Sequence, residues 1–330
     1  RPCVRPRWRR PLRRDVRDRR DLAYNIPNEN GLGGGFMTAC DKGDYPYEPM
    51  TSNNLDASWR VAIGLQDVDG LKPSKYLHSL AAETIEGDLS LSAAGKAIRA
   101  YYKLRDESGE ATDMGEREAD LVSQRITELL SRRAFIMAPS MLVHIHQHLF
   151  QDLDEKTYAP GLYKTDQLVK REYILNGDSV LYGAPEFIDN ALAMFFASEA
   201  SYVYGPVTSA DDVAHLAEFI SHIWQVHPFK EGNTRTIAAF TELYLDYLGF
   251  DAANEPFANN ARYFRNALVR ANYRNAKAGI MPDLKYLIRF LENMLCGADN
   301  DLRSRDMLCE ALFEDPSLIR NMPSSSAIEK

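Results

Sequence analysis

The sequence predicts an all-α protein that contains a single β-hairpin. From Met37 onward, apolar residues recur at helical spacing in most segments. One segment departs from this spacing: two short apolar runs flank Asn176-Gly177, a dipeptide that accepts the positive φ angles of a tight turn. The chain has 330 residues, of which 45% are hydrophobic and 26% charged, so it can bury a sizeable core without disulfides. No run of about 18 apolar residues occurs, which excludes a membrane-spanning helix.

Residues 1–36 are set apart from the rest by their charge. They hold ten arginines and four acidic residues, a net charge of +6 in a chain whose total is −8. An arm that binds nucleic acid or a membrane surface is one interpretation. However, the segment lacks hydrophobic periodicity, and Gly33-Gly34-Gly35 precedes the first methionine, Met37. We therefore expect 1–36 to be disordered or upstream-translated, and predict no nucleic-acid or membrane partner.

Residues 37–115 are predicted to form a small N-terminal helical module. A helix over 73–83 places Tyr76, Leu77 and Leu80 on one face, and Ser90 caps a second helix that runs to Tyr102. The polar, glycine-containing segment 105–115 is the candidate linker. Four cysteines without CxxC spacing suit a reducing compartment, so we expect a cytoplasmic protein.

Residues 116–300 are predicted to form the main domain, followed by a C-terminal helix (304–313) and tail within 301–330. The β-hairpin is expected at 173–182. Helical spacing predicts the helices of the main domain at 116–132, 139–152, 185–202, 210–226, 234–248, 259–274 and 282–296.

The strongest chemical signal is the segment from His227 to Arg235, His-Pro-Phe-Lys-Glu-Gly-Asn-Thr-Arg. Pro228 and Gly232 break a helix, and a new helical pattern begins at Thr234. A helix N-terminus after a glycine turn presents free backbone N–H groups and the positive end of the helix dipole, which together favour an anion.

Three side chains of this segment suit phosphate chemistry. Arg235 opposes the dipole of the helix that it begins, so an anionic ligand explains it better than local stability does. Glu231 offers the hard oxygen ligands that Mg²⁺ prefers when it is shared with phosphates. His227 has an unperturbed pKa near neutrality and is the candidate general base.

The segment resembles the signature of the Fic family, His-x-Phe-x-(Asp/Glu)-Gly-Asn-Gly-Arg followed by a second arginine. The stretches Leu142–Phe150 and Tyr158–Tyr163 are also similar to the family, and the resemblance covers roughly 116–296. It implies a Fic-type helical bundle in which the hairpin is a flap that positions the target. The implied flap residues are Tyr173, Ile174, Leu175, Val180, Leu181 and Tyr182.

The resemblance implies a protein adenylyltransferase, which transfers AMP from ATP to a Ser, Thr or Tyr hydroxyl of a target protein. His227 would take the proton of the hydroxyl, and Glu231 would hold Mg²⁺ between the phosphates. Phe229 would anchor the loop in the core. The nucleotide would be bound by the backbone of Gly232, Asn233 and Thr234, by Arg235, and on the adenine side by Asn272.

Two departures from the family pattern keep alternatives open. Thr234 stands at the second glycine, and Ala238 stands at the second arginine, which in the family binds the γ-phosphate. The alternative reactions are therefore removal of AMP and transfer of another phosphate-containing group, with ADP or another nucleotide as a possible donor. A non-catalytic nucleotide-binding adaptor is a third possibility, and a homo-oligomer is also left open.

Glu86-Gly87 resembles the family's inhibitory helix, in which a glutamate reaches the nucleotide site. Here Ala82 replaces its Ser/Thr residue, and the arginine partner is Ala238. Autoinhibition through Glu86 is one interpretation, and a solvated carboxylate at a helix end is the other. His144, His146 and His148 would lie on one face of a strand as metal ligands do, but their helical context favours ordinary surface histidines.

Overall fold

The computed structural model describes residues 52–205 and 208–320, and no β-strand occurs in these ranges, which confirms the all-α prediction. The arginine-rich segment 1–36 lies outside the described residues. No helix in the described ranges combines the length and apolarity needed to cross a bilayer.

The α-helices are α1 (Ser52–Gly64), α2 (Lys75–Glu86), α3 (Leu91–Ser108), α4 (Met114–Arg132), α5 (Pro139–Phe150), α6 (Glu155–Tyr158), α7 (Ile188–Ser201), α8 (Ala210–Val226), α9 (Asn233–Leu248), α10 (Glu255–Asn272), α11 (Lys285–Leu295) and α12 (Glu310–Glu314). The 3₁₀ turns are η2 (Leu65–Asp69), η3 (Tyr173–Leu175), η4 (Pro185–Phe187), η5 (Ser304–Met307) and η6 (Pro316–Leu318).

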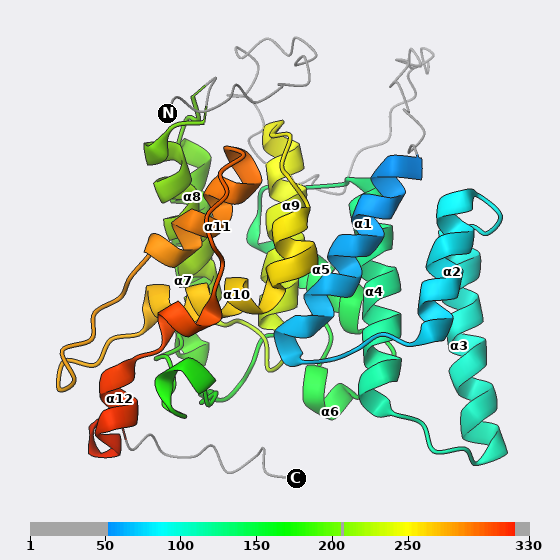
Figure 1. Ribbon diagram of the computed structural model, residues 1–330, viewed down its shortest axis with the longest axis horizontal. Helices are drawn as coiled ribbons and strands as arrows, with labels where there is room; N and C mark the ends of the chain where they lie inside the picture. The colour runs from blue at the N-terminus through cyan, green and yellow to red at the C-terminus, as the bar shows by residue number, and fades with distance from the viewer. Residues whose placement is uncertain (1–51, 206–207, 321–330) are drawn as a thin grey trace, which may run out of the picture.

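Helices α2 and α3 lie at one end of the molecule, with α1 and α4 between them and the central helix α9 (Figure 1). The Ser74 hydroxyl accepts a hydrogen bond from Leu77 N (3.0 Å) and caps α2, which is followed by Gly87 with a φ of 89°. A small apolar core holds this end together. It consists of Trp59, Leu77, Leu80, Ala81, Ala94, Ile98, Tyr102 and Leu121.

Helix α1 was not among the predicted helices because its apolar residues face two different cores. Trp59 belongs to the small core, whereas Val61, Ala62 and the following Leu65 belong to the large one. Its apolar stripe therefore divides between two faces, which weakens the single-faced pattern that sequence analysis detects.

The turn η2 is brought to the centre of the molecule by a close contact between α1 and α10. A Cβ atom at Gly64 would lie 2.3 Å from the backbone oxygen of Ala258, so only glycine allows this approach. Because Gly64 ends α1, the contact places η2 against α4, α9 and α10. The side chain of Asp69, at the end of η2, is thereby directed to the loop before α9.

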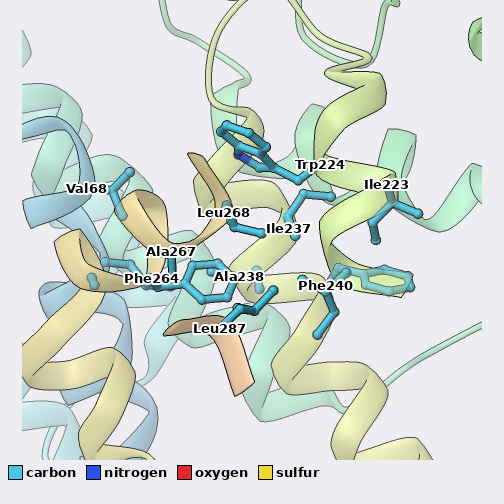
Figure 2. Packing of buried hydrophobic residues seen from close by; sticks show 14 of the residues in the cluster. Val68, Ile223, Trp224, Ile237, Ala238, Phe240, Phe264, Ala267, Leu268 and Leu287 are labelled. Carbon is cyan, nitrogen blue, oxygen red and sulfur yellow. The ribbon is translucent and has the colours of Figure 1, made fainter. Parts of the chain in front are cut away.

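Helix α9 is buried along most of its length and forms the middle of the large core. Ile237, Ala238 and Phe240 pack there with residues of α8 and α10, as Figure 2 shows. Helix α8 begins at a capping box in which the side chains of Ser209 and Asp212 each accept a backbone N–H of the other. The two helices thus hold the connection between them, residues 227–232, from both ends.

The predicted β-hairpin at 173–182 is wrong, although its turn is as expected. Asn176 and Gly177 have φ angles of 49° and 85°, the left-handed values that the dipeptide predicted. The flanking residues form η3 and an irregular segment instead of strands. One bond crosses the turn, from Glu172 N to Asp178 O (3.0 Å), but other groups pair elsewhere: Cys309 N donates to Ile174 O (2.9 Å), and Gly183 N, just after the segment, donates to Gln225 O (3.0 Å). Hydrogen bonds to the C-terminal segment and to α8 therefore replace the other hydrogen bonds that would join the two strands of a hairpin.

Candidate functional site

Residues 227–235, the motif loop, comprise the connection between α8 and α9 and the first three residues of α9, and two residues of the connection are left-handed. His227 (φ 50°) ends α8 and donates its backbone N–H to Trp224 O at 3.0 Å. Gly232 (φ 74°) precedes α9, and a Cβ atom there would lie 2.3 Å from the Phe150 ring. The Asn233 side chain closes the loop, because its Oδ1 accepts from Phe229 N (2.9 Å) and its Nδ2 donates to Phe229 O (2.7 Å).

His146 on α5 holds the other side of the motif loop. Its ring stacks on the buried Phe229 ring, with centroids 3.8 Å apart and planes 7° apart. Nδ1 accepts from Gly161 N at 2.9 Å, so Nε2 carries the proton and donates to Glu231 O at 3.0 Å. Sequence analysis treated His146 as a surface histidine, and this was wrong: the side chain is fully buried.

We expect His146 to make the protein sensitive to acid. Burial lowers the pKa of His146 to about 4. A neutral buried histidine stabilises the fold above its unfolded pKa of about 6.5, and this contribution is lost as the pH falls toward 4. Between pH 7 and pH 5 the wild type should lose about 2 kcal/mol more unfolding free energy than His146→Gln. Urea unfolding at both pH values measures this, and equal losses in the two proteins would contradict it.

His227 lies almost completely buried beneath the flap segment, residues 173–182. The Tyr182 ring lies against it, with centroids 3.9 Å apart, and the Trp224 ring packs edge-on. Burial, with the nearby Lys164 and Lys170 ammonium groups, holds the pKa of His227 well below its usual value. Its Nδ1 has no hydrogen-bond partner among the described residues. His227 is thus held as a neutral imidazole, which is the form that a general base requires.

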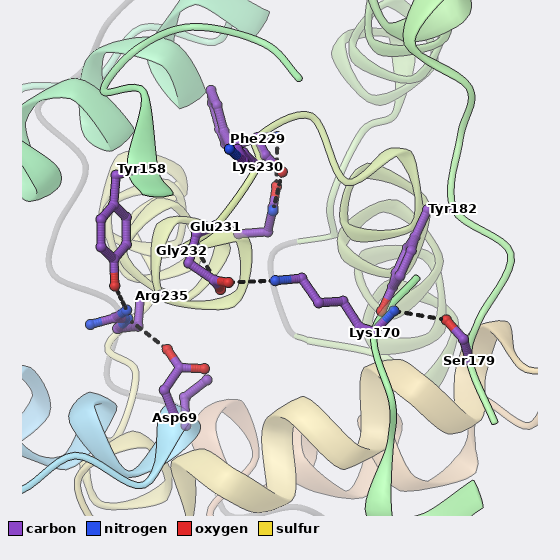
Figure 3. Close-up of polar contacts among 12 residues, drawn as sticks. Asp69, Tyr158, Lys170, Ser179, Tyr182, Phe229, Lys230, Glu231, Gly232 and Arg235 are labelled. Carbon is purple, nitrogen blue, oxygen red and sulfur yellow. Dashed lines mark hydrogen bonds and ion pairs between the residues drawn. The ribbon is translucent and has the colours of Figure 1, made fainter. Parts of the chain in front are cut away.

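Glu231 is ionised and ion-paired. Burial opposes its charge, but the Lys170 ammonium, which donates to Oε2, lowers the pKa of Glu231 below its usual value (Figure 3). Its Oε1 accepts from Gly232 N at 3.1 Å. No group of three or more His, Cys, Asp or Glu side chains in the described ranges could hold a metal ion by itself. One carboxylate nevertheless fits Mg²⁺ that is shared with substrate phosphates.

Arg235 is not open to a ligand in this structure. Its side chain is 1% exposed and lies behind the first turn of α9. Nη2 donates to Glu118 (2.7 Å), Nη1 donates to Gln66 (3.2 Å), and Nε lies 2.9 Å from Asp69 Oδ2. Figure 3 shows the guanidinium between Tyr158 and Asp69. The residue that the sequence predicted as a phosphate ligand therefore ties α9 to α4 and η2.

A small cavity, the loop cavity, lies at the N-terminus of α9. Its volume of about 20 Å³ is room for about one water molecule. His227, Glu231 and the residues Gly232, Asn233 and Thr234 line it, as the predicted site requires. Lys170, Glu172, Arg265 and Asp69 also line it, and sequence analysis missed these four because they lie far along the chain from the motif loop. Ion pairs of Lys170 with Glu231, and of Arg265 with Asp69 and Glu172, close the site.

Asn272 lies on a separate and larger cavity of about 520 Å³. Its Nδ2 donates to Ser221 Oγ (3.0 Å) and to Leu268 O (2.9 Å). Leu181 of the flap segment also lines this cavity, and the next residue, Tyr182, contacts His227. The flap segment thus contacts both the cavity beside Asn272 and the motif loop.

The predicted flap residues divide into two groups. The side chains of Ile174, Leu175, Val180 and Tyr182 are buried, whereas Tyr173 and Leu181 are exposed. The two exposed side chains are the ones that could contact a partner.

The predicted inhibitory residue, Glu86, does not reach the motif loop. It is exposed at the last residue of α2, and the carboxylates beside Arg235 are those of Asp69 and Glu118. Ala238 is fully buried among apolar side chains (Figure 2), so this structure has no room for an arginine there.

One known family model matches the part of the chain that contains the motif loop. Residues 137–245 match the family model described as the Fic/DOC family, a range that includes His146, the flap segment and the motif loop. No curated protein sequence matches the chain. Among solved structures, a Fic-domain-containing signaling protein from Bacteroides thetaiotaomicron matches with 16% identity and a TM-score of 0.38, over 80% of this chain and 97% of that chain.

Proposed function

We propose that this chain, whose residues 137–245 match the Fic/DOC family model, is a Fic-type transferase that transfers AMP from ATP to a Ser, Thr or Tyr hydroxyl of a target protein. One observation carries the proposal. A neutral, almost fully buried His227 lines the same cavity as Glu231 and the N-terminus of α9. A general base, a carboxylate and an anion-binding helix end are thereby brought together in one place.

The reaction follows from these positions. The target hydroxyl oxygen attacks the α-phosphorus of ATP, the bond from that phosphorus to the β-phosphate oxygen breaks, and pyrophosphate leaves. The hydroxyl proton passes to the imidazole of His227. Backbone N–H groups of Gly232, Asn233 and Thr234 hold phosphate oxygens at the helix end, where the helix dipole stabilises their charge. Glu231 would hold Mg²⁺ together with those oxygens, and the ion would neutralise part of the phosphate charge.

The ion pairs around the loop cavity support a resting state in which the nucleotide site is closed. Lys170 is ion-paired with the carboxylate of Glu231, and Asp69 is ion-paired with both Arg235 and Arg265. A nucleotide cannot enter a space of about 20 Å³ unless these pairs separate. We therefore place any inhibition by the N-terminal helices at Asp69 of η2 in preference to Glu86.

The experiment is labelling with α-³²P-ATP and Mg²⁺, which detects self-modification without a known target. We compare the wild type with Asp69→Ala, Glu86→Gly and His227→Ala. We expect label in the wild type, more label in Asp69→Ala, a wild-type level in Glu86→Gly, and none in His227→Ala. ATP binding without label in any protein would favour a nucleotide-binding adaptor.

A second candidate is transfer from a donor with a shorter phosphate chain. Burial of Ala238 favours it, because the family's γ-phosphate arginine is missing and its place is filled by core side chains. A panel of ATP, ADP and other nucleotide donors tests this alternative. Stronger labelling by a donor without a γ-phosphate would support it over the first proposal.

A further inference from the structure

The cationic side chains at the loop cavity come from outside the motif loop. Among the described residues, the cations that line the loop cavity are Lys170 and Arg265, whereas Arg235 is directed away from it. Lys170 precedes the flap segment, and its backbone N–H donates to Ser179 Oγ at 3.1 Å, which fixes the start of its side chain. Arg265 belongs to α10 and is part-buried, with a side chain that is 25% exposed.

Each of the two cations is held by a carboxylate at present. The Lys170 ammonium donates to Glu231 (Figure 3). The Arg265 guanidinium donates to Asp69 Oδ1 at 3.0 Å and to Glu172 Oε1 at 3.1 Å. Removal from water makes an unpaired charge costly, so a replacement anion is favoured at each cation if its carboxylate moves away. A phosphate group would provide that replacement at both positions.

We propose that Lys170 and Arg265 form the second half of the phosphate site and bind the outer phosphates of the nucleotide in place of an arginine at position 238. This inference rests on the proposed function, because it assumes that a nucleotide enters the loop cavity. The N-terminus of α9 holds one side of the phosphate chain, and the two cations hold the other. Binding then exchanges ionic partners: Lys170 leaves Glu231, and Arg265 leaves Asp69 and Glu172. Glu231 is freed at the same moment.

The first test measures the affinity for ATP, AMP and inorganic tripolyphosphate by calorimetry in EDTA, so that no metal is needed. We compare the wild type with Lys170→Met and Arg265→Met. Charge-assisted hydrogen bonds to phosphate are strong, and each variant should bind ATP and tripolyphosphate about tenfold more weakly or worse. AMP, which lacks the outer phosphates, should change by less than about threefold.

Two matched controls come from the same surroundings. Arg262 lies on α10 one turn before Arg265 and pairs with Asp67 of η2, yet it does not line the loop cavity. Lys285 pairs with Asp283 at the start of α11. Arg262→Met and Lys285→Met should bind ATP as the wild type does. Equal losses in controls and test variants would show a general charge effect and overturn the inference.

A double-mutant cycle separates contact with phosphate from simple neutralisation of Glu231. If Lys170 only cancels the Glu231 charge, Lys170→Met together with Glu231→Gln should bind tripolyphosphate as tightly as Glu231→Gln alone, which overturns the proposal for Lys170. If Lys170 contacts phosphate, the double variant stays about tenfold weaker. For Arg265, pairing Arg265→Met with Glu172→Gln avoids a buried unpaired carboxylate, so the test remains valid if the single variant unfolds.

The outcomes distinguish the inference from the proposed function. If neither the wild type nor Asp69→Ala binds ATP or tripolyphosphate, the proposed function fails and the inference fails with it. If the wild type binds and both test variants match the controls, the inference alone fails. Selective loss of triphosphate binding in Lys170→Met and Arg265→Met supports both.

Discussion

Replacement of His227 by alanine is expected to lower the transfer rate by about 10²–10⁴-fold, since this is the contribution of a positioned general base. Nucleotide affinity should remain within about threefold of the wild type, because the phosphates are held by the helix end and by cations, and not by the imidazole. Single-turnover labelling measures the first quantity and calorimetry the second. His144→Ala is the matched control, since His144 is an exposed histidine of α5 away from the motif loop.

The pH dependence of transfer should show whether His227 keeps, during the reaction, the buried environment that it has in this structure. Because its pKa is held well below 6.5, the imidazole is already neutral at pH 6.5 and is protonated only at lower pH. The rate should therefore stay level as the pH falls through 6.5, whereas an exposed histidine would lose half its activity there. A midpoint near pH 6.5 in the wild-type profile would show that His227 is more open to water than in this structure.

Local chemistry along the chain predicted most of the helices and the motif loop. Ser74, Ser90 and the Ser209–Asp212 capping box begin helices close to the predicted starts, and the connection between α8 and α9 lies where Pro228 and Gly232 required it. These signals act over a few residues and are therefore readable from sequence. The Asn176-Gly177 turn was predicted correctly for the same reason, but the strands beside it depended on distant partners.

The missed residues of the site share one property: each is brought to the motif loop by packing between distant segments. Asp69 reaches Arg235 because Gly64 lets α1 pack closely on α10, and Lys170 reaches Glu231 from a segment about 60 residues earlier. His146 was assigned to the surface together with His144 and His148 because their helical context favoured surface positions over a metal site. Its burial follows from the stacking partner Phe229, 83 residues away.

Arg235 shows most clearly how tertiary structure changes a local interpretation. An arginine in the first turn of a helix opposes the dipole, and an anionic ligand was the simplest explanation. In the structure, the anions that pair with Arg235 are carboxylates of the protein itself, those of Asp69 and Glu118. Three elements, η2, α4 and α9, thus meet at one guanidinium. The same contact joins the N-terminal helices to the domain that carries His227, so its loss should be visible in stability as well as in binding.

Replacement of Arg235 by methionine is therefore expected to destabilise the protein by about 3–5 kcal/mol, the usual cost of removing one partner of a buried ion pair. Asp69 and Glu118 would lose a buried cation, and Gln66 would lose a hydrogen-bond donor. Urea unfolding at pH 7 measures the change. Arg60→Met is the control, because its pair with Asp56 is exposed and should contribute at most about 1 kcal/mol.

The alternative interpretation of Arg235 predicts the opposite pattern. A phosphate ligand that faces solvent in the free protein would change stability by less than about 1 kcal/mol on replacement, and would abolish ATP binding. The Arg235→Met, Glu118→Gln double variant decides between the two. Because Glu118→Gln removes one of the carboxylates that Arg235→Met leaves unpaired, the double variant should recover part of the lost stability. Recovery of stability without recovery of affinity would show that Arg235 both joins the N-terminal helices to α9 and contacts phosphate when the site opens.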